Sequence, residues 1–306
     1  MKNLLLIFSL LLIINCEDST SSDDKLNFTQ TTPCNGNRYG ASAVSYNGEV
    51  YLIGGAYATT YYSTIEKLDE VNNQWIVLNN QVVGRRYLTA EVVDGIIYII
   101  GGEGSNGSFI DAVQAYNIAN NTLTTVSYLP TKRRQMNSIV YDDDIYVVGG
   151  ELENTGIRTN IVEVYDVMSN SWSSLAPMPT ARECDVALVS GNIYAFGGYD
   201  GSSALANVEI YNIENNSWSA ANDMPYPLSA YHLASFENFI YLFGDYSERI
   251  DEVNMYNSDD ASWTNLSTNF TGRRHAAVVK NNDWIYVIGG SDGPTIYDIV
   301  EKCKPF

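Results

Sequence analysis

The 306-residue sequence has little positive charge. It carries 17 lysine and arginine residues against 36 aspartate and glutamate residues, which gives a formal net charge of −19. Binding of nucleic acid needs clustered basic residues that neutralise phosphates, and attachment to anionic lipid through side chains needs a basic patch. The charge balance therefore argues against a nucleic-acid-binding protein and against a protein held on membranes by basic residues.

The usual signatures of catalytic and metal sites are also absent. The sequence contains no phosphate-binding loop, nucleophile elbow, HExxH motif or CxxC pair. Its two histidines, His232 and His275, are expected at equivalent positions of the repeat described below, each at the start of a strand. Because no third ligand lies at a local spacing, a zinc or copper site is not expected. We expect neither a metal nor a cofactor.

The apolar run near the N terminus is too short for a comfortable membrane span. Lys2 precedes an apolar run over residues 4–14, whereas a spanning helix needs about 20 apolar residues. This pattern predicts a signal peptide over residues 1–15, with a buried N-terminal helix as the alternative. Residues 17–25 include no apolar side chain, so we expect a flexible acidic tether over residues 16–26 and a folded domain over residues 27–306.

The end of the signal peptide has a recognisable pattern. Ile13-Ile14-Asn15-Cys16 resembles a bacterial lipobox, in which the Cys thiol is diacylated and becomes the mature N-terminus, although Asn15 departs from the usual small residue. The resemblance implies an exported protein of the bacterial cell envelope, lipid-anchored to a membrane through Cys16 and touching it only there. Ordinary signal cleavage, which gives a secreted or periplasmic soluble protein, is the alternative.

The rest of the sequence is typical of a folded, β-rich protein with an internal repeat. It is 45% hydrophobic and 17% charged, with 23 Tyr and 23 Gly. Short β-rich runs end in Gly54-Gly55, Gly101-Gly102, Gly149-Gly150, Gly197-Gly198 and Gly289-Gly290, and Gly244-Asp245 is an altered copy. The first glycines are 47, 48, 48, 47 and 45 residues apart. Six copies at this period take up about 280 residues, nearly everything after the tether.

Other residue types keep the same phase. Tyr165 and Trp172 are seven positions apart, and the same spacing recurs in other copies. Two residues before the Trp column lies an asparagine, where a hairpin turn can use a left-handed residue. These asparagines are Asn73, Asn121, Asn170 and Asn216. About ten residues after the Trp column lies an arginine, at Arg86, Arg134, Arg182 and Arg274.

Each copy therefore predicts four short strands joined by turns, the pattern of a propeller blade. Arginine, a strand, Gly-Gly, Tyr-Asp or Tyr-Asn and Trp, in this order, resemble the kelch repeat over about residues 28–303. The resemblance implies an all-β fold, a six-bladed kelch-type β-propeller with four antiparallel strands per blade. It also implies a role in interactions, and we expect a monomer.

The two chain ends are expected to complete the last blade together. Cys303 takes the place of Tyr211 in that blade, and the chain ends before a Trp-bearing fourth strand. Phe28 lies ten residues before Arg38, the distance from Trp172 to Arg182. An N-terminal strand around Phe28 should therefore close the sixth blade, which removes the exposed edges of an open arc.

The cysteines of the closing blade raise the question of a disulfide. In the antiparallel pairing Cys303 faces Phe28, and Cys34 lies six residues further, about 20 Å away along a strand. A bridge needs Cα atoms within about 7 Å. A Cys34–Cys303 bridge would thus need the loop at Cys34 to fold back, and it stays an open alternative. Cys184 is expected as a buried free thiol.

Two polar columns are candidate binding groups. The arginine column, including Arg38, precedes the innermost strands and should surround one mouth of the central channel. Another column holds Glu66, Gln114, Glu163, Glu209, Asn254 and Glu301. Such columns either satisfy one another structurally, as their repetition suggests, or attract an anionic ligand such as a carboxylate or acidic peptide.

Loops and departures from the repeat add further candidates. Tyrosines suit contacts with proteins or sugars because they combine a rigid apolar face with a polar tip. The candidate loop residues are Tyr57, Tyr61, Tyr62, Tyr199, Asp200 and Tyr246. In the fifth copy, Tyr231 stands where Arg is expected and Asp245 where the second Gly belongs, through drift or as a displaced carboxylate near the channel.

Two functional hypotheses follow. The first is a non-enzymatic binding module for a protein or glycan, acting through the loops of one propeller face. The second is a small carbohydrate-modifying enzyme of the sialic acid mutarotase type, an activity found in some exported bacterial kelch propellers. In the enzyme, an Arg at the channel mouth and a carboxylate such as Asp245 would transfer protons. Nothing in the sequence demands catalysis.

Overall fold

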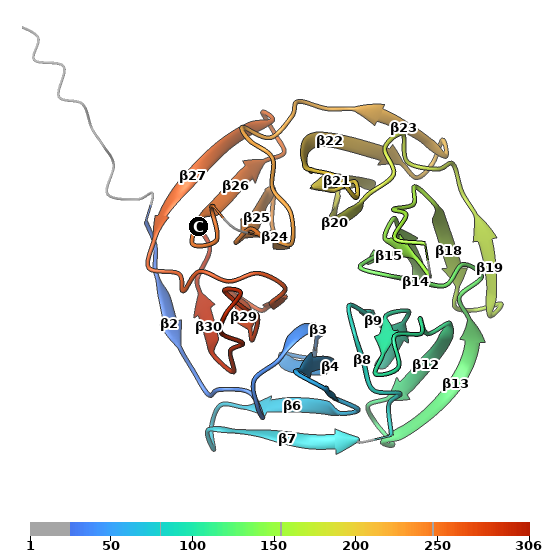
Figure 1. Cartoon of the computed structure of the whole chain (residues 1–306), viewed down its shortest axis with the longest axis vertical. Coiled ribbons are helices and arrows are strands. Elements are labelled where there is room, and N and C mark those ends of the chain that lie inside the picture. Colours follow the sequence, from blue (N-terminus) through green and yellow to red (C-terminus); the bar gives the residue numbers. More distant parts are fainter. Residues whose placement is uncertain (1–24, 80, 154, 247) are drawn as a thin grey trace, which may run out of the picture.

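The computed structural model describes residues 25–79, 81–153, 155–246 and 248–306. The predicted signal peptide, Cys16 and most of the tether lie outside them. The described chain is built of strands and loops, and it contains no helix long and apolar enough to cross a membrane. Six sheets surround a central axis (Figure 1), so the prediction of a six-bladed, all-β propeller is confirmed.

The blades follow one another along the chain, and each contains four main antiparallel strands. Blade one is β3 (Tyr39–Tyr46), β4 (Glu49–Tyr57), β6 (Ile65–Asp69) and β7 (Gln74–Asn79); blade two is β9 (Thr89–Val93), β10 (Ile96–Ile100), β12 (Ala112–Asn117) and β13 (Thr122–Tyr128). Blade three is β15 (Asn137–Tyr141), β16 (Asp144–Val148), β18 (Val162–Asp166) and β19 (Ser171–Ser174); blade four is β20 (Glu183–Val189), β21 (Asn192–Tyr199), β22 (Ala204–Asn212) and β23 (Ser217–Ala220). Blade five is β24 (His232–Phe236), β25 (Phe239–Phe243), β26 (Val253–Asn257) and β27 (Ser262–Thr268).

Blade six and the short strands complete the structure. Blade six is β28 (Ala277–Asn281), β29 (Trp284–Ile288), β30 (Val300–Cys303) and β2 (Phe28–Gln30). The short strands are β1 (Lys25–Leu26), β5 (Thr60–Tyr61), β8 (Arg85–Arg86), β11 (Glu103–Gly104), β14 (Arg133–Arg134) and β17 (Glu151–Leu152). β8 pairs with β11, and β14 with β17, near the centre of the ring.

The ring is closed by the N-terminal strand, as the spacing predicted. β2 pairs antiparallel with β30, with Phe28 opposite Cys303. Just before it, β1 pairs in parallel with β27 of blade five, so the N-terminal segment bridges two blades (Figure 1). Leu26 and Phe28 are buried. Burial of a large apolar side chain stabilises a fold by about 1.5–3 kcal/mol, so both residues hold the ring together.

The hydrophobic core lies between the blades. Each of six clusters of buried apolar side chains joins two neighbouring blades. The outer part of a blade holds the predicted pair of columns: Tyr165 lies opposite Trp172 in adjacent strands, with ring centroids 5.0 Å apart. The turn asparagines are left-handed as expected; Asn170 has φ 55° and donates and accepts through its amide.

A buried arginine in five blades ties the inner and outer strands together. In blade three, Arg133 Nη1 lies 2.6 Å from Glu163 Oε2, and its Nη2 donates to the Val147 carbonyl at 3.2 Å. Blade two has an amide instead: Arg85 donates to Gln114 Oε1 at 2.7 Å. The members are Arg38, Arg85, Arg133, Arg182 and Arg273, paired with Glu66, Gln114, Glu163, Glu209 and Glu301. The two polar columns therefore satisfy each other in these blades.

This pattern corrects the predicted arginine column. Arg182 and Arg38 align with the first arginine of each Arg-Arg pair, such as Arg133, and not with Arg134. Adjacent residues of a strand point in opposite directions, so only one of the two can enter the blade. Arg182 is fully buried inside its blade, so the prediction that it lies at the channel mouth is wrong.

The prediction for blade five is also corrected. Leu228, and not Tyr231, takes the place of the buried arginine, since its N–H pairs with Leu205 as the Arg182 N–H pairs with Thr159. Tyr231 is buried three residues later, and its hydroxyl donates to the Phe196 carbonyl at 2.5 Å. Asp245 replaces a glycine, but it is not among the residues with positive φ.

The structure also tests the predictions for the cysteines and histidines. Cys34, Cys184 and Cys303 are free and buried, so the described residues contain no Cys34–Cys303 bridge. His232 and His275 are not equivalent. His232 lies opposite Phe243 as Ala277 lies opposite Ile288, whereas His275 precedes its strand by two residues.

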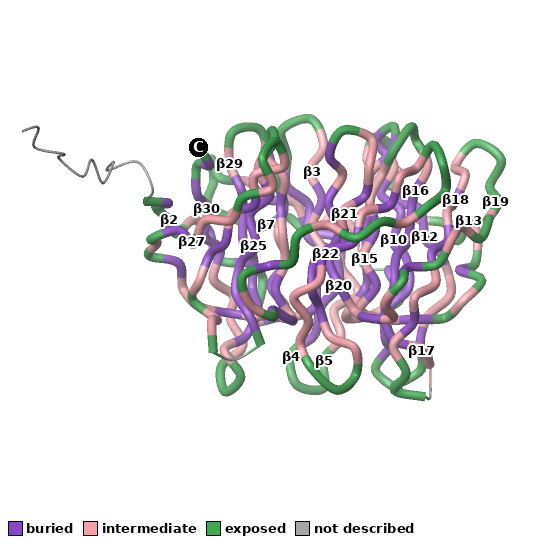
Figure 2. The backbone as a smooth tube through the Cα atoms, turned by 90° about the horizontal axis from the view of Figure 1, so that it is seen from above, coloured by how far each residue is buried: buried purple, intermediate pink, exposed green. Residues whose placement is uncertain are grey.

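The two ends of the propeller differ. One end carries the short hairpin turns within each blade, for example at residues 47–48 and 142–143; we call it the turn face. The other end carries the loops between the second and third strands and between blades, with β5 and β17; we call it the loop face. Figure 2 shows these loops projecting from the lower side, with the C terminus on the upper side.

Candidate functional site

A series of four backbone hydrogen bonds links five of the six blades where the channel opens on the loop face. The Gln135 N–H donates to the Tyr87 carbonyl, and the Tyr87 N–H to the Gly40 carbonyl, at 3.0 and 2.7 Å. The Gly40 N–H donates to His275, and the His275 N–H to Ala230, at 2.9 and 3.0 Å. All five residues have φ between 52° and 64°. This conformation costs a non-glycine residue about 1–2 kcal/mol, so these hydrogen bonds hold strained residues at the mouth, at every position of the series except Gly40.

A chain of alternating charges runs along the same mouth across blades two, three and four. Its members, which we call the charged arc, are Arg86, Glu103, Arg134, Glu151, Arg158 and Glu183. The register of the short strands creates it, because Arg86 lies opposite Glu103 and Arg134 lies opposite Glu151. Arg134 contacts both glutamates, and Arg158 Nη2 lies 2.6 Å from Glu183 Oε1.

Aromatic rings support the arginines of the charged arc. The guanidinium of Arg86 lies 5.0 Å from the Tyr87 ring centroid, and that of Arg158 lies 4.8 Å from the Tyr199 centroid. Stacked and paired arginines are fixed in orientation. The arc is therefore a rigid surface in which most of the arginine charge is already balanced, and not a free ring of positive charge.

The surroundings of the charged arc shift the pKa values of Glu103 and Glu183 in opposite directions. Burial alone would raise the pKa of Glu103, but hydrogen bonds from Arg86 and Arg134 hold it below its usual value. Burial dominates at Glu183 and raises its pKa to about 7, although Arg158 acts in the opposite direction. Gln135 Nε2 also donates to Glu183 at 2.8 Å. Glu183 therefore exchanges a proton near neutral pH.

An aromatic cluster adjoins the charged arc at the mouth, because Arg86 contacts both Tyr39 and Tyr87. Tyr39, Tyr87 and His275 form a cluster, with the Tyr87 and His275 ring centroids 5.2 Å apart. Burial lowers the pKa of His275 to about 3, helped by His232 and nearby arginines, so the imidazole is neutral at physiological pH. The mouth thus carries a neutral aromatic cluster beside the charged arc.

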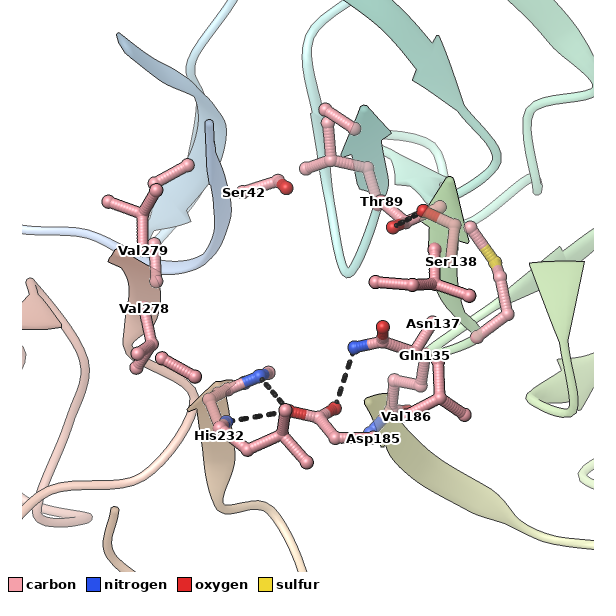
Figure 3. Close-up of a pocket in the computed structure, with 18 of the residues that line it drawn as sticks. Ser42, Thr89, Gln135, Asn137, Ser138, Asp185, Val186, His232, Val278 and Val279 are labelled. Atoms are coloured by element: carbon pink, nitrogen blue, oxygen red, sulfur yellow. Dashed lines mark hydrogen bonds and ion pairs between the residues drawn. The ribbon is translucent and has the colours of Figure 1, made fainter. Parts of the chain in front are cut away.

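Inside the mouth lies the central channel, with a volume of about 400 Å³ and walls formed by the innermost strands of all six blades. Asp185 is its most connected polar residue. Its carboxylate accepts from Asn137 Nδ2 at 2.9 Å and from the Leu233 N–H at 3.2 Å, and it lies 3.0 Å from His232 Nδ1 (Figure 3). Burial alone would lower the pKa of His232, but Asp185 raises it above the usual value.

A second acid, Glu91, lines the channel from blade two. The Ser138 hydroxyl donates to Glu91 Oε1 at 2.8 Å. Burial raises the pKa of Glu91 to about 8, and this hydrogen bond only partly offsets the effect. Among the residues that the structure describes, no three histidines, cysteines or acids gather as potential metal ligands.

Comparison with known proteins places this arrangement in a family. The KLHDC2/KLHL20/DRC7 Kelch-repeats domain matches residues 7–183 and 89–290, which together span most of the chain. The chain belongs to the kelch-repeat family.

Individual kelch proteins are similar over shorter stretches. Kelch-like protein 23 of Homo sapiens is 32% identical over 175 residues, covering 56% of this chain and 30% of that protein. Spermatocyte protein spe-26 of Caenorhabditis elegans is 28% identical over 249 residues, covering 78% of this chain and 44% of that protein. The chain thus spans less than half the length of these relatives.

The loop tyrosines of this kelch propeller differ in exposure. Tyr57 is 46% exposed on the loop face. Tyr62 is packed, because the Arg38 guanidinium lies 3.9 Å from its ring centroid and its hydroxyl donates to Asn37. Tyr61 lies against Arg86. Tyr57 is therefore the freest of the three for contact with a ligand.

The remaining predicted residues lie in other loops. Tyr246 is 55% exposed, and Arg274 stacks on it at 3.9 Å and donates to its carbonyl. Asp200 caps its own turn, accepting from the N–H groups of residues 202 and 203. Asp245 accepts from the Ser229 N–H at 3.0 Å and does not line the channel. The loop face therefore brings Tyr61, Arg86 and Arg134 together through Glu103. It also pairs Arg274 with Tyr246, whereas Arg182 lies inside a blade.

Several residues of the kelch propeller site were not predicted, and the sequence held a signal for some of them. Glu91 is the clearest case. The equivalent positions, each opposite a tyrosine of the second strand, are Val44, Ile139, Ala187, Ala234 and Val279. One glutamate in such an apolar column marks a special position. Arg158 had no comparable signal, because its loop varies between blades.

Proposed function

We propose that this kelch propeller is an exported, lipid-anchored binding module that contacts a protein or glycan through its loop face. The observation that carries the proposal is the set of exposed apolar side chains held in those loops. Tyr57, Val83, Ile157 and Tyr246 are each 45–59% exposed. Exposed aromatic residues on a rigid support are typical anchors of binding surfaces.

The surroundings of these residues support the proposal. The charged arc and its stacked rings fix the loop bases, so little ordering is lost when a ligand binds. Kelch propellers typically serve as protein-binding modules, and membership of the family therefore favours this role. The predicted signal peptide and Cys16 motif support export and anchoring, which would leave the propeller free at the end of an acidic tether.

Replacement of exposed loop-face tyrosines should weaken binding. The protein without its signal peptide is applied to arrays of peptides and glycans, and the hits are measured by titration. Tyr57→Ala and Tyr246→Ala should each weaken the hits about tenfold or more, the usual effect of losing an aromatic anchor. Both side chains are exposed, so neither change should disturb folding.

Tyr141 is the matched control. It is 38% exposed on the turn face, at the end of β15. Tyr141→Ala should leave binding unchanged. An equal loss with Tyr141→Ala, or hits that tolerate both loop-face changes, would contradict the proposed surface.

Anchoring has a separate test. When the full chain is produced in a bacterium, mass spectrometry of the mature N terminus should find Cys16 carrying a diacylglyceryl group. Cys16→Ala should move the protein from the membrane to the soluble fraction, because stable anchoring needs the acyl chains. Cys34→Ala, at a buried free thiol, should not. An unmodified N terminus downstream of Cys16 would refute the anchor.

A further inference from the structure

The central channel has a polarity pattern of its own. At the level nearest the loop face its wall is polar, with Ser42, Asn137, Asp185 and His232 around the opening (Figure 3). Deeper in the channel the wall is mostly apolar, formed by residues such as Ala90, Val186, Val278 and Val279. A volume of about 400 Å³ is within the usual range of small-molecule sites.

Glu91 is an acid in this deeper, mostly apolar level. It follows Thr89 by two residues, about 6.6 Å further along β9 at the usual strand rise. Its one hydrogen-bond partner among the described residues is the Ser138 hydroxyl, on Oε1. A half-buried carboxylate that lies among apolar side chains and has no cationic partner is unfavourable. A ligand that brings a positive charge would remove this cost.

None of the charged groups that the structure describes around Glu91 supplies a positive charge to its carboxylate. Asp185 and His232, across the channel, are paired with each other, and Lys280 lies over the Phe236 ring at the turn-face end. No charged residue contributes to the shifted pKa of Glu91, which arises from burial and the Ser138 hydrogen bond. The titratable residues in the strands packed against β9 are Tyr39 and Tyr46 in β3, Tyr98 in β10 and Tyr141 in β15.

Polar groups without a partner in the described part of the chain lie near the opening, above this acid. The Ser42 hydroxyl, the Asn137 carbonyl oxygen and His232 Nε2 have no hydrogen-bond partner among the described residues. Ser42 and Asn137 point towards the open centre in Figure 3. They can receive the polar end of a ligand whose body lies against the valines.

We propose that the channel binds a small organic amine, with its ammonium group on Glu91 and its apolar body against Val186, Val278 and Val279. This site lies inside the ring and is independent of the loop-face contacts. It needs neither the exposed tyrosines nor the lipid anchor. The amine's charge would be balanced by the carboxylate, and its body would replace water against apolar walls.

Binding of an amine is then coupled to release of a proton. Glu91 must ionise to pair with the ammonium group, and its pKa of about 8 means that it is mostly protonated at pH 7. Affinity should therefore rise about tenfold per pH unit from pH 6 towards pH 8 and then level off. An alkyl ammonium stays protonated throughout this range, since its pKa is close to that of lysine, about 10.4.

Calorimetry with matched probes tests the site. Cyclohexylamine should bind at pH 8 at least about tenfold more tightly than cyclohexanol, which has the same shape without the charge. Cyclohexanecarboxylate should not bind. Titrations at pH 7 in two buffers of different ionisation enthalpy should show about one proton released per amine bound. Cyclohexanol binding as tight as that of the amine, or no binding of the amine, would overturn the proposal.

Glu91→Gln identifies the acceptor. This variant keeps the shape of the side chain, and it should weaken amine binding at pH 8 about tenfold or more and remove its pH dependence. Glu237→Gln, on the exposed hairpin of blade five, controls for general loss of charge and should change neither. A pH dependence that persists in Glu91→Gln would assign the proton to another group and refute the site. If that variant does not fold, the proton release of the unaltered protein decides.

Discussion

Removal of the N-terminal closing segment should lower the stability of the propeller more than any single substitution. A chain that starts at residue 32 lacks β1 and β2, whereas one that starts at residue 25 keeps them. The truncation removes Leu26 and Phe28, which are 1% and 5% exposed. Loss of side chains of this kind costs about 2–5 kcal/mol each. We expect the thermal midpoint to fall by roughly 10 °C or more, with a less cooperative transition.

The expected loss comes from two interfaces, because the segment pairs with both β27 and β30. Phe28→Ala alone should reproduce about half of the effect, since Phe28 packs against Phe243 and Phe270 from blade five. Thr29→Ala, at an exposed position of the same strand, is the matched control and should have little effect. Calorimetry measures all of these changes. A truncated chain with an unchanged transition would show that the ring does not depend on this closure.

The buried arginine of blade three should be the most sensitive point inside a blade. Glu163→Leu should lower the free energy of unfolding by about 3–5 kcal/mol, because it leaves the Arg133 guanidinium buried without its counter-charge. Glu163→Gln should cost much less, about 1–2 kcal/mol. Blade two is the natural precedent, since Arg85 there pairs with Gln114. Urea unfolding of the variants measures both differences.

A double replacement completes the cycle. Arg133→Met combined with Glu163→Leu removes both charges, so it should recover part of the stability lost in Glu163→Leu. Recovery should be incomplete, because the Val147 carbonyl loses the hydrogen bond from Arg133. The control is Lys67→Met, which removes an exposed partner of Glu49 and should cost less than about 1 kcal/mol. Equal costs for Glu163→Leu and Glu163→Gln would show that charge pairing in the blade is unimportant.

The architecture could be predicted from the sequence because each blade repeats the same physical requirements. Burial of Tyr165 against Trp172, a left-handed Asn170 and a buried acid at Glu163 recur at a fixed period, and the structure confirms their pairing. The closing strand could be predicted for the same reason. Its register follows from the distance between Phe28 and Arg38, which equals that between Trp172 and Arg182.

The errors arise where spacing alone does not separate neighbours. Arg133 and Arg134 are identical and adjacent, so only the side to which each points distinguishes the buried residue from the one at the mouth. Blade four has a bulge between Glu183 and Asp185, which shifts the register of nearby residues relative to the other blades. The charged arc depends on contacts between loops of different blades, for example Arg134 with Glu103, and no periodic pattern encodes such contacts.

The pairing of β2 with β30 also determines when the propeller can close during synthesis. Phe28 and Cys303 are 275 positions apart (303 − 28), and they meet only in the finished ring. At ribosomal rates of about 5–20 residues per second, β30 emerges on the order of ten seconds to a minute after its partner β2. During that interval Leu26 and Phe28 have no native neighbours. A chaperone or translocation step that keeps the early chain unfolded would therefore keep Leu26 and Phe28 from non-native contacts. These residues then remain available for the pairing of β2 with β30, which is the last step in closing the propeller.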